Sequence, residues 1–230
     1  MPGDNRLTPK AIIFDIDGTL LDSVDLHAKA WAQALKKYGY EPALADIRAQ
    51  IGKGSDQLLP VFLTTAEIKT FGKALEKDRA DMWRRYYLPL VKPFPAVRAL
   101  FLHLKLLGQT IALASSAKAD ELDRYKEIAD IGDLVETSTT SDDADQSKPH
   151  PDIFAVALER LKLRPDEAIA VGDTRWDAEA AAKLGLKTIG LLCGGSAETT
   201  LRAAGCVAIY RDPADLLANY DGSPLAKRSG

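Results

Sequence analysis

The chain has 230 residues, of which 46% are hydrophobic and 27% are charged, a composition ordinary for a globular protein with a sizeable core. Its formal net charge of −3 excludes the strong basic patterning typical of proteins that bind nucleic acids or anionic membranes. No apolar stretch approaches the ~20 residues of a membrane span, and the polar segment MPGDNRLTPK does not resemble a signal peptide. We therefore expect a cytoplasmic protein with no nucleic-acid partner and no membrane partner.

The stretch Ala11–Ser23, AIIFDIDGTLLDS, predicts the centre of the fold. Its first four residues are apolar and predict a short buried strand, and Asp15 and Asp17 follow directly. In parallel α/β sheets the ligand crevice lies at the carboxyl ends of the strands. Two carboxylates are costly to bring together at such an edge unless a positive group joins them, and Mg²⁺ prefers oxygen ligands. The stretch therefore predicts a Mg²⁺ site.

The next seventy residues contain only helical patterns. Ser23 is the expected cap of a helix that runs to about Tyr38, and the later helical segments are Ala43–Gln50, Gln57–Phe62 and a long helix that begins at Thr64 or Thr65. An all-helical block of this length is more typical of an inserted domain than of ordinary crossovers. We predict a helical cap domain at residues 22–94 and an α/β core domain at residues 1–21 and 95–230, with Pro93 and Pro95 at the hinge.

Strands and helices alternate in the rest of the chain, which is the signature of a parallel sheet with helices on both faces. The predicted strands are Thr110–Ala114, Leu134–Val135, Ala168–Val171, Lys187–Leu191 and Val207–Ile209, and the predicted helices are Val97–Leu107, Lys118–Ala129, Pro151–Leu161, Arg175–Leu184, Ala197–Ala204 and Pro213–Ala218. We expect residues 137–146 to form a polar loop, residues 1–10 a loose tail, and the polar segment from Asp221 to be disordered. The pattern indicates a doubly wound α/β fold.

Three further polar sites follow strands or precede helices. Ser115 and Ser116 come between a strand and a helix, where hydroxyl and backbone N–H groups suit a phosphate oxygen, although a simple helix cap has the same pattern. Lys148 lies at the mouth of a helix, where an ammonium group can neutralise a phosphoryl group, although most lysines are solvated. Asp173 and Asp177 are separated by one helical turn near a helix start, which also favours acids without any function.

Taken together, these four motifs resemble those of the haloacid dehalogenase superfamily, in the subfamily with a helical cap inserted after the first motif. The matching residues are DIDGT at Asp15–Thr19, the strand-end Ser115, Lys148 within SKPHPD, and GDTRWD at Gly172–Asp177. The resemblance covers nearly the whole chain and implies a Rossmann-like core sheet with that cap. It also implies hydrolase chemistry on phosphate esters.

The resemblance implies a role for each acid of the motifs. Asp15 would be the nucleophile that forms an aspartyl-phosphate, and Asp17 would be the general acid and base. Mg²⁺ would be held by Asp15, by the backbone carbonyl of Asp17 and by Asp173. Asp177 would orient water or Lys148 from outside the ligand set.

The phosphoryl oxygens would be held by Ser115, Ser116, Lys148 and the backbone near Gly18, with Thr19 supporting that loop. Cap residues that could face the acidic loop and select the substrate are His27, Arg48, Lys53, Gly54 and Ser55. For Arg48 and Lys53 a solvated helix end is an equal interpretation, and His27 is as readily a core residue as a substrate contact.

We therefore expect a Mg²⁺-dependent phosphatase that acts on a small phosphorylated metabolite, as a monomer or a homodimer. Phosphoglycolate, a sugar phosphate and a nucleoside monophosphate all remain open as substrates. The main alternative is a sugar-phosphate mutase of the β-phosphoglucomutase kind, whose cap entry resembles DLHAKAW. Those mutases carry Lys before the cap glycine, Arg three residues after it and Glu at the position of Gly172, whereas this chain has Ile51 and Ser55 around Gly52. A binding module without catalysis is disfavoured because every catalytic position is filled.

Overall fold

A six-stranded parallel sheet forms the centre of the computed structural model, which describes residues 8–226. The strand order is β5-β4-β1-β6-β7-β8, so the first strand of the chain lies in the middle of the sheet. Its strands are β1 (Ala11–Phe14), β4 (Thr110–Ala114), β5 (Thr137–Thr139), β6 (Ala168–Gly172), β7 (Lys187–Leu191) and β8 (Ala208–Tyr210). Every neighbouring pair is parallel, which confirms the predicted doubly wound α/β fold.

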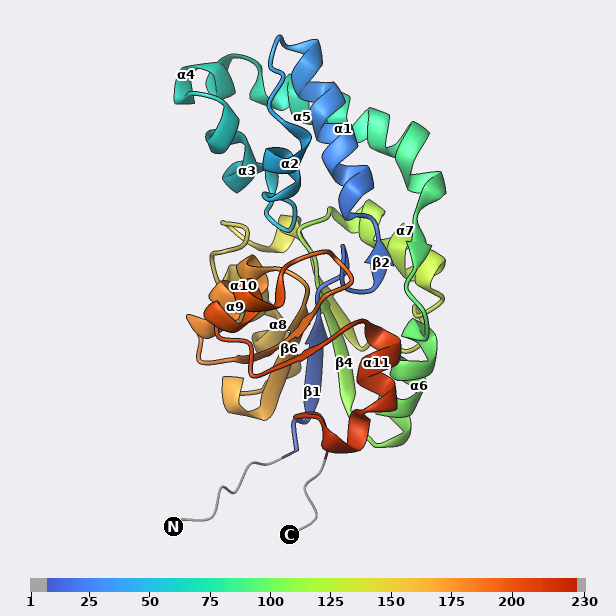
Figure 1. The fold of residues 1–230 in the computed structure, drawn as a ribbon. Coiled ribbons are helices and arrows are strands. Elements are labelled where there is room, and N and C mark those ends of the chain that lie inside the picture. The colour runs from blue at the N-terminus through green and yellow to red at the C-terminus, as the bar shows by residue number, and fades with distance from the viewer. Residues whose placement is uncertain (1–7, 227–230) are drawn as a thin grey trace.

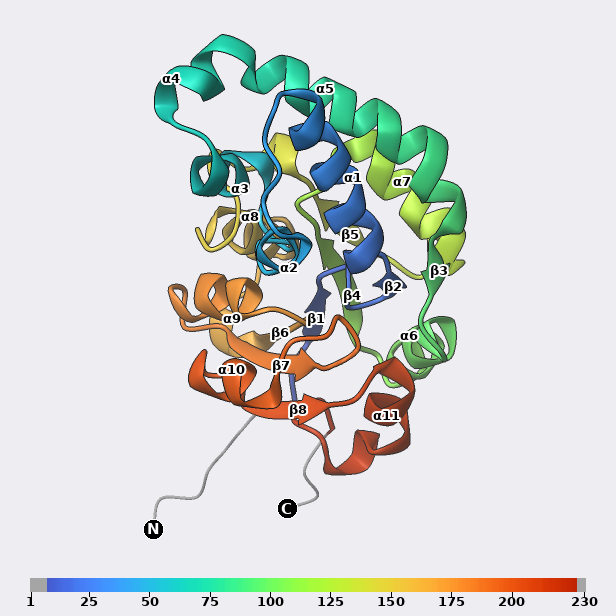
Figure 2. The ribbon, with the colours of Figure 1, turned by 45° about the horizontal axis from the view of Figure 1, so that its top comes forward.

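Helices cover both faces of this sheet (Figure 2). One face packs against α6 (Val97–Leu106), α7 (Ala119–Ala129) and α11 (Pro213–Ala218), and the other against α8 (Asp152–Leu161) and α9 (Arg175–Ala182), beside which lies α10 (Glu198–Ala203). Alternation along β1 decides the two faces, because Ile12 and Phe14 enter the first cluster and Ala11 and Ile13 the second. The second face is rich in alanine, which lets α8 approach the sheet closely.

Residues 24–90, called the helical insertion from here on, lie beyond the carboxyl end of β1 (Figure 1). They form α1 (Val24–Lys37), α2 (Leu44–Arg48), α3 (Ser55–Phe62), α4 (Thr65–Glu67), α5 (Lys73–Met82), the π-helical turns Ile68–Gly72 and Trp83–Tyr87, and a 3₁₀ turn at Leu88–Leu90. Many of their apolar side chains form a separate cluster around Leu35 and Leu75, both fully buried, whereas Ala30, Trp83 and Tyr87 join the main cluster. The short strands β2 (Leu21–Asp22) and β3 (Lys92–Pro93) pair antiparallel where the insertion joins the sheet.

The fifth strand lies a few residues beyond its predicted place. Leu134 and Val135 are not a strand, and β5 is instead formed by Thr137–Thr139, within the segment predicted as a loop. Leu134 is buried because it packs from the turn after α7 into the main cluster. Thr139 is fully buried in the strand because its hydroxyl donates to the carbonyl oxygen of Ile153 at 3.1 Å. A strand buried through hydrogen-bonded polar side chains has no apolar pattern that would reveal it in the sequence.

The segment predicted to be disordered from Asp221 is ordered through residue 226. Leu225 is fully buried, and the side-chain amide of Gln109 donates to its carbonyl oxygen at 2.9 Å. Tyr220 donates to the side-chain oxygen of Gln109 at 2.9 Å. At the other end Pro9 is buried, and the backbone N–H of Lys10 donates to Glu167, so these two residues are not part of a loose tail. The remaining predicted tail residues, 1–7 and 227–230, lie outside the described residues.

No helix between residues 8 and 226 combines the length and apolarity that a membrane crossing would require.

The anchoring of the C-terminal segment can be tested by stability. Leu225→Ala should lower the free energy of unfolding by about 2–5 kcal/mol, because it opens a cavity in a fully buried position. Leu106→Ala removes the same atoms from a leucine that is 85% exposed and should change stability by no more than about 0.5 kcal/mol. Urea unfolding of both variants measures the difference, and equal small effects would show that the segment does not contribute to the core.

Candidate active site

The site is organised around Lys148, a fully buried lysine. Its ammonium group lies 2.5 Å from Oδ1 of Asp15 and 2.7 Å from Oδ1 of Asp177, and it donates to the carbonyl oxygen of Ala114 at 3.0 Å. These partners come from the ends of β1 and β4 and from the first turn of α9, so the parallel sheet brings them together. A buried ammonium is tolerated only with such partners, and the two carboxylates raise the pKa of Lys148 even though burial, the largest single influence, lowers it.

Asp177 has a second task at the start of α9. Its Oδ2 accepts hydrogen bonds from the backbone N–H of Thr174 at 3.1 Å and from the Thr174 hydroxyl at 2.6 Å, while the hydroxyl accepts from the Asp177 N–H. This capping box fixes the carboxylate, which therefore holds Lys148 from a rigid position. A Cβ at Gly172 would lie 2.6 Å from Cβ and Cγ of Asp177, so a side chain there would displace the carboxylate.

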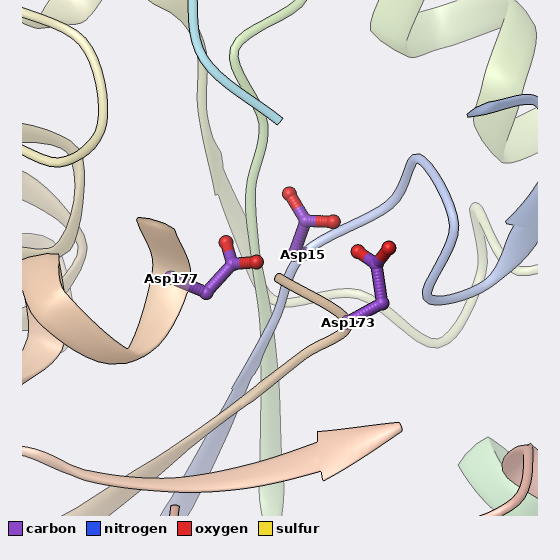
Figure 3. A group of neighbouring side chains, drawn as sticks. All are labelled: Asp15, Asp173 and Asp177. Atoms are coloured by element: carbon purple, nitrogen blue, oxygen red, sulfur yellow. The ribbon is translucent and has the colours of Figure 1, made fainter. Parts of the chain in front are cut away.

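Asp173, at the end of β6, brings a third buried carboxylate close to those of Asp15 and Asp177, as Figure 3 shows. One oxygen each from Asp15, Asp173 and Asp177 lie within 4.8 Å of one another. The Thr19 hydroxyl contacts Oδ2 of Asp15 at 3.1 Å and Oδ1 of Asp173 at 3.2 Å, but Oδ2 of Asp173 is buried without a hydrogen-bond donor among residues 8–226. An unpaired buried carboxylate oxygen is costly, so this atom requires a ligand.

The charges of the cluster do not balance. Burial, together with repulsion from Asp177 and Asp17, raises the pKa of Asp15 to about 7 despite the Lys148 ammonium. Burial and the carboxylates of Asp15 and Asp177 raise the pKa of Asp173 well above its ordinary range. Lys148 supplies one positive charge to three carboxylates, and Asp177 is also engaged by Thr174. Asp15 and Asp173 are therefore the two carboxylates best placed to share a hard cation, and their oxygens fit Mg²⁺.

Two glycines make room for the carboxylate of Asp173. A Cβ on Gly194, in the loop after β7, would lie 1.7 Å from Oδ2 of Asp173, and one on Gly18 would lie 2.3 Å from the same atom. Gly18 also has a φ of +82°, which only glycine adopts easily. Sequence reasoning missed Gly194, although the Gly194–Gly195 pair after a predicted strand was a signal of close backbone approach.

Asp17 is directed toward the helical insertion rather than toward Lys148. Its Oδ1 accepts a hydrogen bond from the Ser23 hydroxyl at 2.6 Å and lies 2.9 Å from Nε2 of His27, on α1. Burial alone would raise the pKa of Asp17, but His27, the Ser23 hydroxyl and the charge of Arg79 together hold it below its ordinary value. His27 was predicted as a possible substrate contact, and in the structure its ring contacts this carboxylate.

Arg79, on α5, determines how His27 can act. Its guanidinium donates to Nδ1 of His27 and can only donate, so the hydrogen of the neutral ring resides on Nε2, facing Asp17. The His27 ring stacks on Trp83 with centroids 3.6 Å apart, and the Tyr125 hydroxyl lies 3.2 Å from Nε2. Sequence reasoning missed Arg79 and Tyr125 as site residues, because nothing in a helical pattern distinguishes them from solvated neighbours.

The two strand-end serines differ in their surroundings. Ser115 is buried, and its hydroxyl accepts from the backbone N–H of Ala117 at 3.1 Å, as in a helix-start turn. Ser116 lies beside a cavity of about 610 Å³ between the helical insertion and the core, and its hydroxyl donates to the carbonyl oxygen of Gly52 at 3.3 Å.

The cavity reaches Asp15 and Asp17, and four of the five predicted cap contacts line it: His27, Lys53, Gly54 and Ser55. Arg48 does not. Its guanidinium pairs with Asp25 at 2.6 Å and donates to the carbonyl oxygen of Gly194 at 2.9 Å, so it joins the insertion to the core instead. Charged cavity residues that sequence reasoning did not name lie on α3, on α5 and its continuation, and in or beside the first turn of α7: Asp56, Lys73, Glu76, Lys77, Arg79, Asp81, Arg84, Lys118 and Glu121.

Comparison with known proteins agrees with this architecture. The family model described as haloacid dehalogenase-like hydrolase matches residues 12–191, and the chain belongs to that family. A phosphorylated carbohydrates phosphatase from Thermotoga maritima is 29% identical over 90% of this chain and 96% of its own length. A phosphoglycolate phosphatase from Aquifex aeolicus is 30% identical over 80% of this chain and 85% of its own length.

Solved structures show the same fold. A hydrolase from Pseudomonas syringae superposes with a TM-score of 0.83 at 28% identity, covering 92% of this chain and 98% of that protein. A candidate β-phosphoglucomutase from Bacteroides vulgatus superposes with a TM-score of 0.84 at 21% identity, covering 97% of this chain and 93% of that protein. At that identity the second likeness shows the fold alone.

The room that Gly194 provides for Asp173 yields a test of the cation site. Gly194→Ala should weaken Mg²⁺ binding by about ten- to a hundredfold, because the new methyl group displaces the unpaired oxygen. Titration calorimetry with Mg²⁺ measures the affinity, and thermal unfolding in chelator checks the fold. Gly132→Ala is the matched control, because its Cβ meets only the Lys126 side chain, at 4.0 Å. Equal affinities in the two variants would mean that Asp173 does not hold the ion.

Proposed function

We propose that this protein is a Mg²⁺-dependent phosphatase that hydrolyses a small phosphorylated metabolite through an aspartyl-phosphate on Asp15. The observation that carries the proposal is the buried cluster in which Lys148 bridges Asp15 and Asp177 while one oxygen of Asp173 has no donor. Membership of the hydrolase family and phosphatase relatives over 90% of the chain support the same class. The helical insertion would act as the cap of this site.

Asp15 suits the role of nucleophile. Its carboxylate borders the cavity, and the contacts from Lys148 and Thr19 fix its orientation for in-line attack on phosphorus. Mg²⁺ held by Asp15, Asp173 and the backbone carbonyl of Asp17 would neutralise charge on the phosphoryl oxygens. Lys148 and the N–H groups around Gly18 would hold those oxygens, and such positioning provides most of the catalysis in phosphoryl transfer.

Asp17 suits proton transfer to the leaving oxygen and from the hydrolytic water. It borders the cavity, and Ser23 and His27 hold its carboxylate in one rotamer. A bound phosphate dianion raises the proton affinity of a neighbouring carboxyl, so substrate binding would favour the acid form needed in the first step. The ionised form would then accept the proton of the attacking water in the second step.

The cavity favours a sugar phosphate among the possible substrates. Its lining is mainly charged or hydroxylic, and Trp31 is the only ring besides His27 among the described lining residues. Since Trp31 is only 6% exposed, it offers little surface for stacking a nucleobase. A volume of about 610 Å³ leaves room for a molecule larger than a two-carbon ester such as phosphoglycolate. The carbohydrate phosphatase among the relatives supports the same class.

The mutase remains the second candidate because mutase-like proteins share the fold. Those mutases carry glutamate at the position of Gly172, and here a side chain at that position would collide with Asp177. The favoured reaction is therefore hydrolysis.

A panel of phosphate esters tests the proposal. With Mg²⁺, hexose phosphates should release phosphate faster than phosphoglycolate or nucleoside monophosphates, and chelator or Asp15→Asn should abolish release. A phosphate assay gives the rates, and chromatography of the glucose 1-phosphate reaction detects any glucose 6-phosphate. Isomerisation with little phosphate release would replace the phosphatase by the mutase, and full activity of Asp15→Asn would exclude the aspartyl-phosphate.

The contacts of Asp17 generate a second prediction. His27→Ala and Arg79→Ala should each reduce kcat for a sugar phosphate by a large part of the ~10²–10⁴-fold that general acid catalysis supplies. The loss should be smaller for p-nitrophenyl phosphate, because its leaving oxygen needs no proton. Comparison of the single-turnover rates of phosphoryl transfer from the two substrates separates this effect from a general loss of structure, because the later hydrolysis of the aspartyl-phosphate is the same step for both. Identical losses in the transfer step would contradict the orientation of Asp17 by His27.

A further inference from the structure

One segment of the helical insertion contacts the core beside three of the four sequence motifs. The carbonyl oxygen of Gly52 accepts from Ser116, and the Lys53 ammonium lies 4.0 Å from the ring centroid of Trp176. Further along this segment, Gly54 and Asp56 contact the residue immediately before Lys148. The sequence neighbours of the contacted core residues are Ser115, Asp177 and Lys148.

The contact beside Lys148 is the most extensive of the three. The backbone N–H of Ser147 donates to Oδ2 of Asp56 at 3.1 Å, and the Ser147 hydroxyl donates to Oδ1 of the same carboxylate. The Ser147 hydroxyl also accepts from the backbone N–H of Gly54 at 3.0 Å. Ser147 is buried, so the start of α3 holds both the backbone and the side chain of this core residue. We call these contacts the Asp56–Ser147 latch.

We propose that Asp56 is a positioning residue that acts through Ser147 to place Lys148, so that seating of the helical insertion completes the active site. The role in catalysis rests on the proposed function, because it assumes that Lys148 holds Asp15 and the phosphoryl group. Asp56 is a carboxylate on the insertion and Ser147 belongs to the core, so the latch exists only when the two are in contact.

The reaction itself makes such a restraint useful. In the resting site Lys148 is held by the carboxylates of Asp15 and Asp177. Transfer of the phosphoryl group converts the Asp15 carboxylate into an acyl phosphate, so the carboxylate charge that Lys148 faced is lost. The latch is untouched by this change, so Ser147 keeps the backbone of Lys148 in place while its partner changes. A displacement of about 1 Å in such a group can reduce a rate by up to about a hundredfold.

Two independent substitutions break the latch. Asp56→Ala removes the acceptor, whereas Asp56→Asn keeps one oxygen for the Ser147 N–H and should retain part of the effect. Gly54→Ala keeps the Asp56 side chain, but its Cβ would lie 2.4 Å from Oγ of Ser147 and 2.8 Å from Oδ1 of Asp56, so it disrupts the latch from within. Because Gly54 has φ −77° and ψ 170°, alanine adopts its backbone conformation without strain. An effect of Gly54→Ala on exchange at the Ser147 amide therefore reports on the latch and not on backbone strain.

Asp120→Ala is the matched control. Asp120, on α7, pairs with Arg84 of the insertion at 2.8 Å, so it too joins the insertion to the core, but it contacts no residue beside Lys148. Asp56→Ala and Gly54→Ala should reduce kcat by ten- to a hundredfold with a smaller change in KM. Asp120→Ala should leave kcat nearly unchanged, and thermal unfolding should show every variant folded at the assay temperature. Equal losses of kcat in Asp56→Ala and Asp120→Ala would mean that any contact between the insertion and the core has the same effect, and this result would overturn the proposal.

Amide hydrogen exchange tests the latch without any substrate. Exchange at the Ser147 amide, resolved by NMR, should become faster in Asp56→Ala, less so in Asp56→Asn, and remain as in the parent in Asp120→Ala. If the parent releases no phosphate from any ester, the proposed function fails, while the exchange result still decides whether Asp56 holds Ser147. Unchanged exchange in Asp56→Ala, or faster exchange with full kcat, would overturn the proposal.

Discussion

The buried ammonium of Lys148 is the interaction on which the site depends. A charged group without solvent exposure is stable only among fixed acceptors, and here two carboxylates and one carbonyl oxygen supply them. Each acceptor is in turn fixed by ordinary structure: Asp15 by the end of β1, the Ala114 carbonyl by β4, and Asp177 by the capping box of α9. The strand order, with β1 between β4 and β6, therefore brings together the acceptors that stabilise the Lys148 ammonium.

The same constraint leaves an excess of negative charge beside Lys148. Lys148 supplies one positive charge among three buried carboxylates, and burial together with repulsion between the carboxylates raises the pKa of both Asp15 and Asp173. Packing around Asp173 is as specific as its charge, because Gly18 and Gly194 let two loops approach its carboxylate from different strand ends. The charge of the cluster and the missing side chains of Gly18 and Gly194 thus act on the same atom, Oδ2 of Asp173.

Features that follow from a local sequence pattern could be predicted, whereas features that depend on contacts between distant parts of the sequence could not. The parallel sheet and the meeting of Asp15 with Asp173 were predictable, because apolar strands followed by acids place those acids at one edge. The strand Thr137–Thr139 was not, since its burial rests on hydrogen bonds rather than on apolar side chains. Nor was the anchored Leu225, whose carbonyl oxygen accepts from Gln109, a residue more than a hundred positions away.

The contacts of the helical insertion were the least predictable part, because they arise only when separate elements are seated together. Arg48 illustrates this: its charge suggested a substrate contact, but its guanidinium is engaged by Asp25 and the Gly194 carbonyl. Arg79 is the converse case, a helix residue with no distinguishing pattern that orients His27 against Asp17.

These placements separate two tasks within the insertion. In the segment from Gly52 to Asp56 the charged groups are engaged with the core, Lys53 on the Trp176 ring and Asp56 on Ser147. Lys73 on α5 and Lys118 beside α7 line the cavity and have no hydrogen-bond or ion-pair partner among residues 8–226, so the charges free to meet a substrate lie there. Within α5 itself, Lys73 is without such a partner whereas Arg79 is engaged with His27, so a substitution at Lys73 would alter the charge of the cavity and leave the contacts of both Asp17 and Lys148 in place.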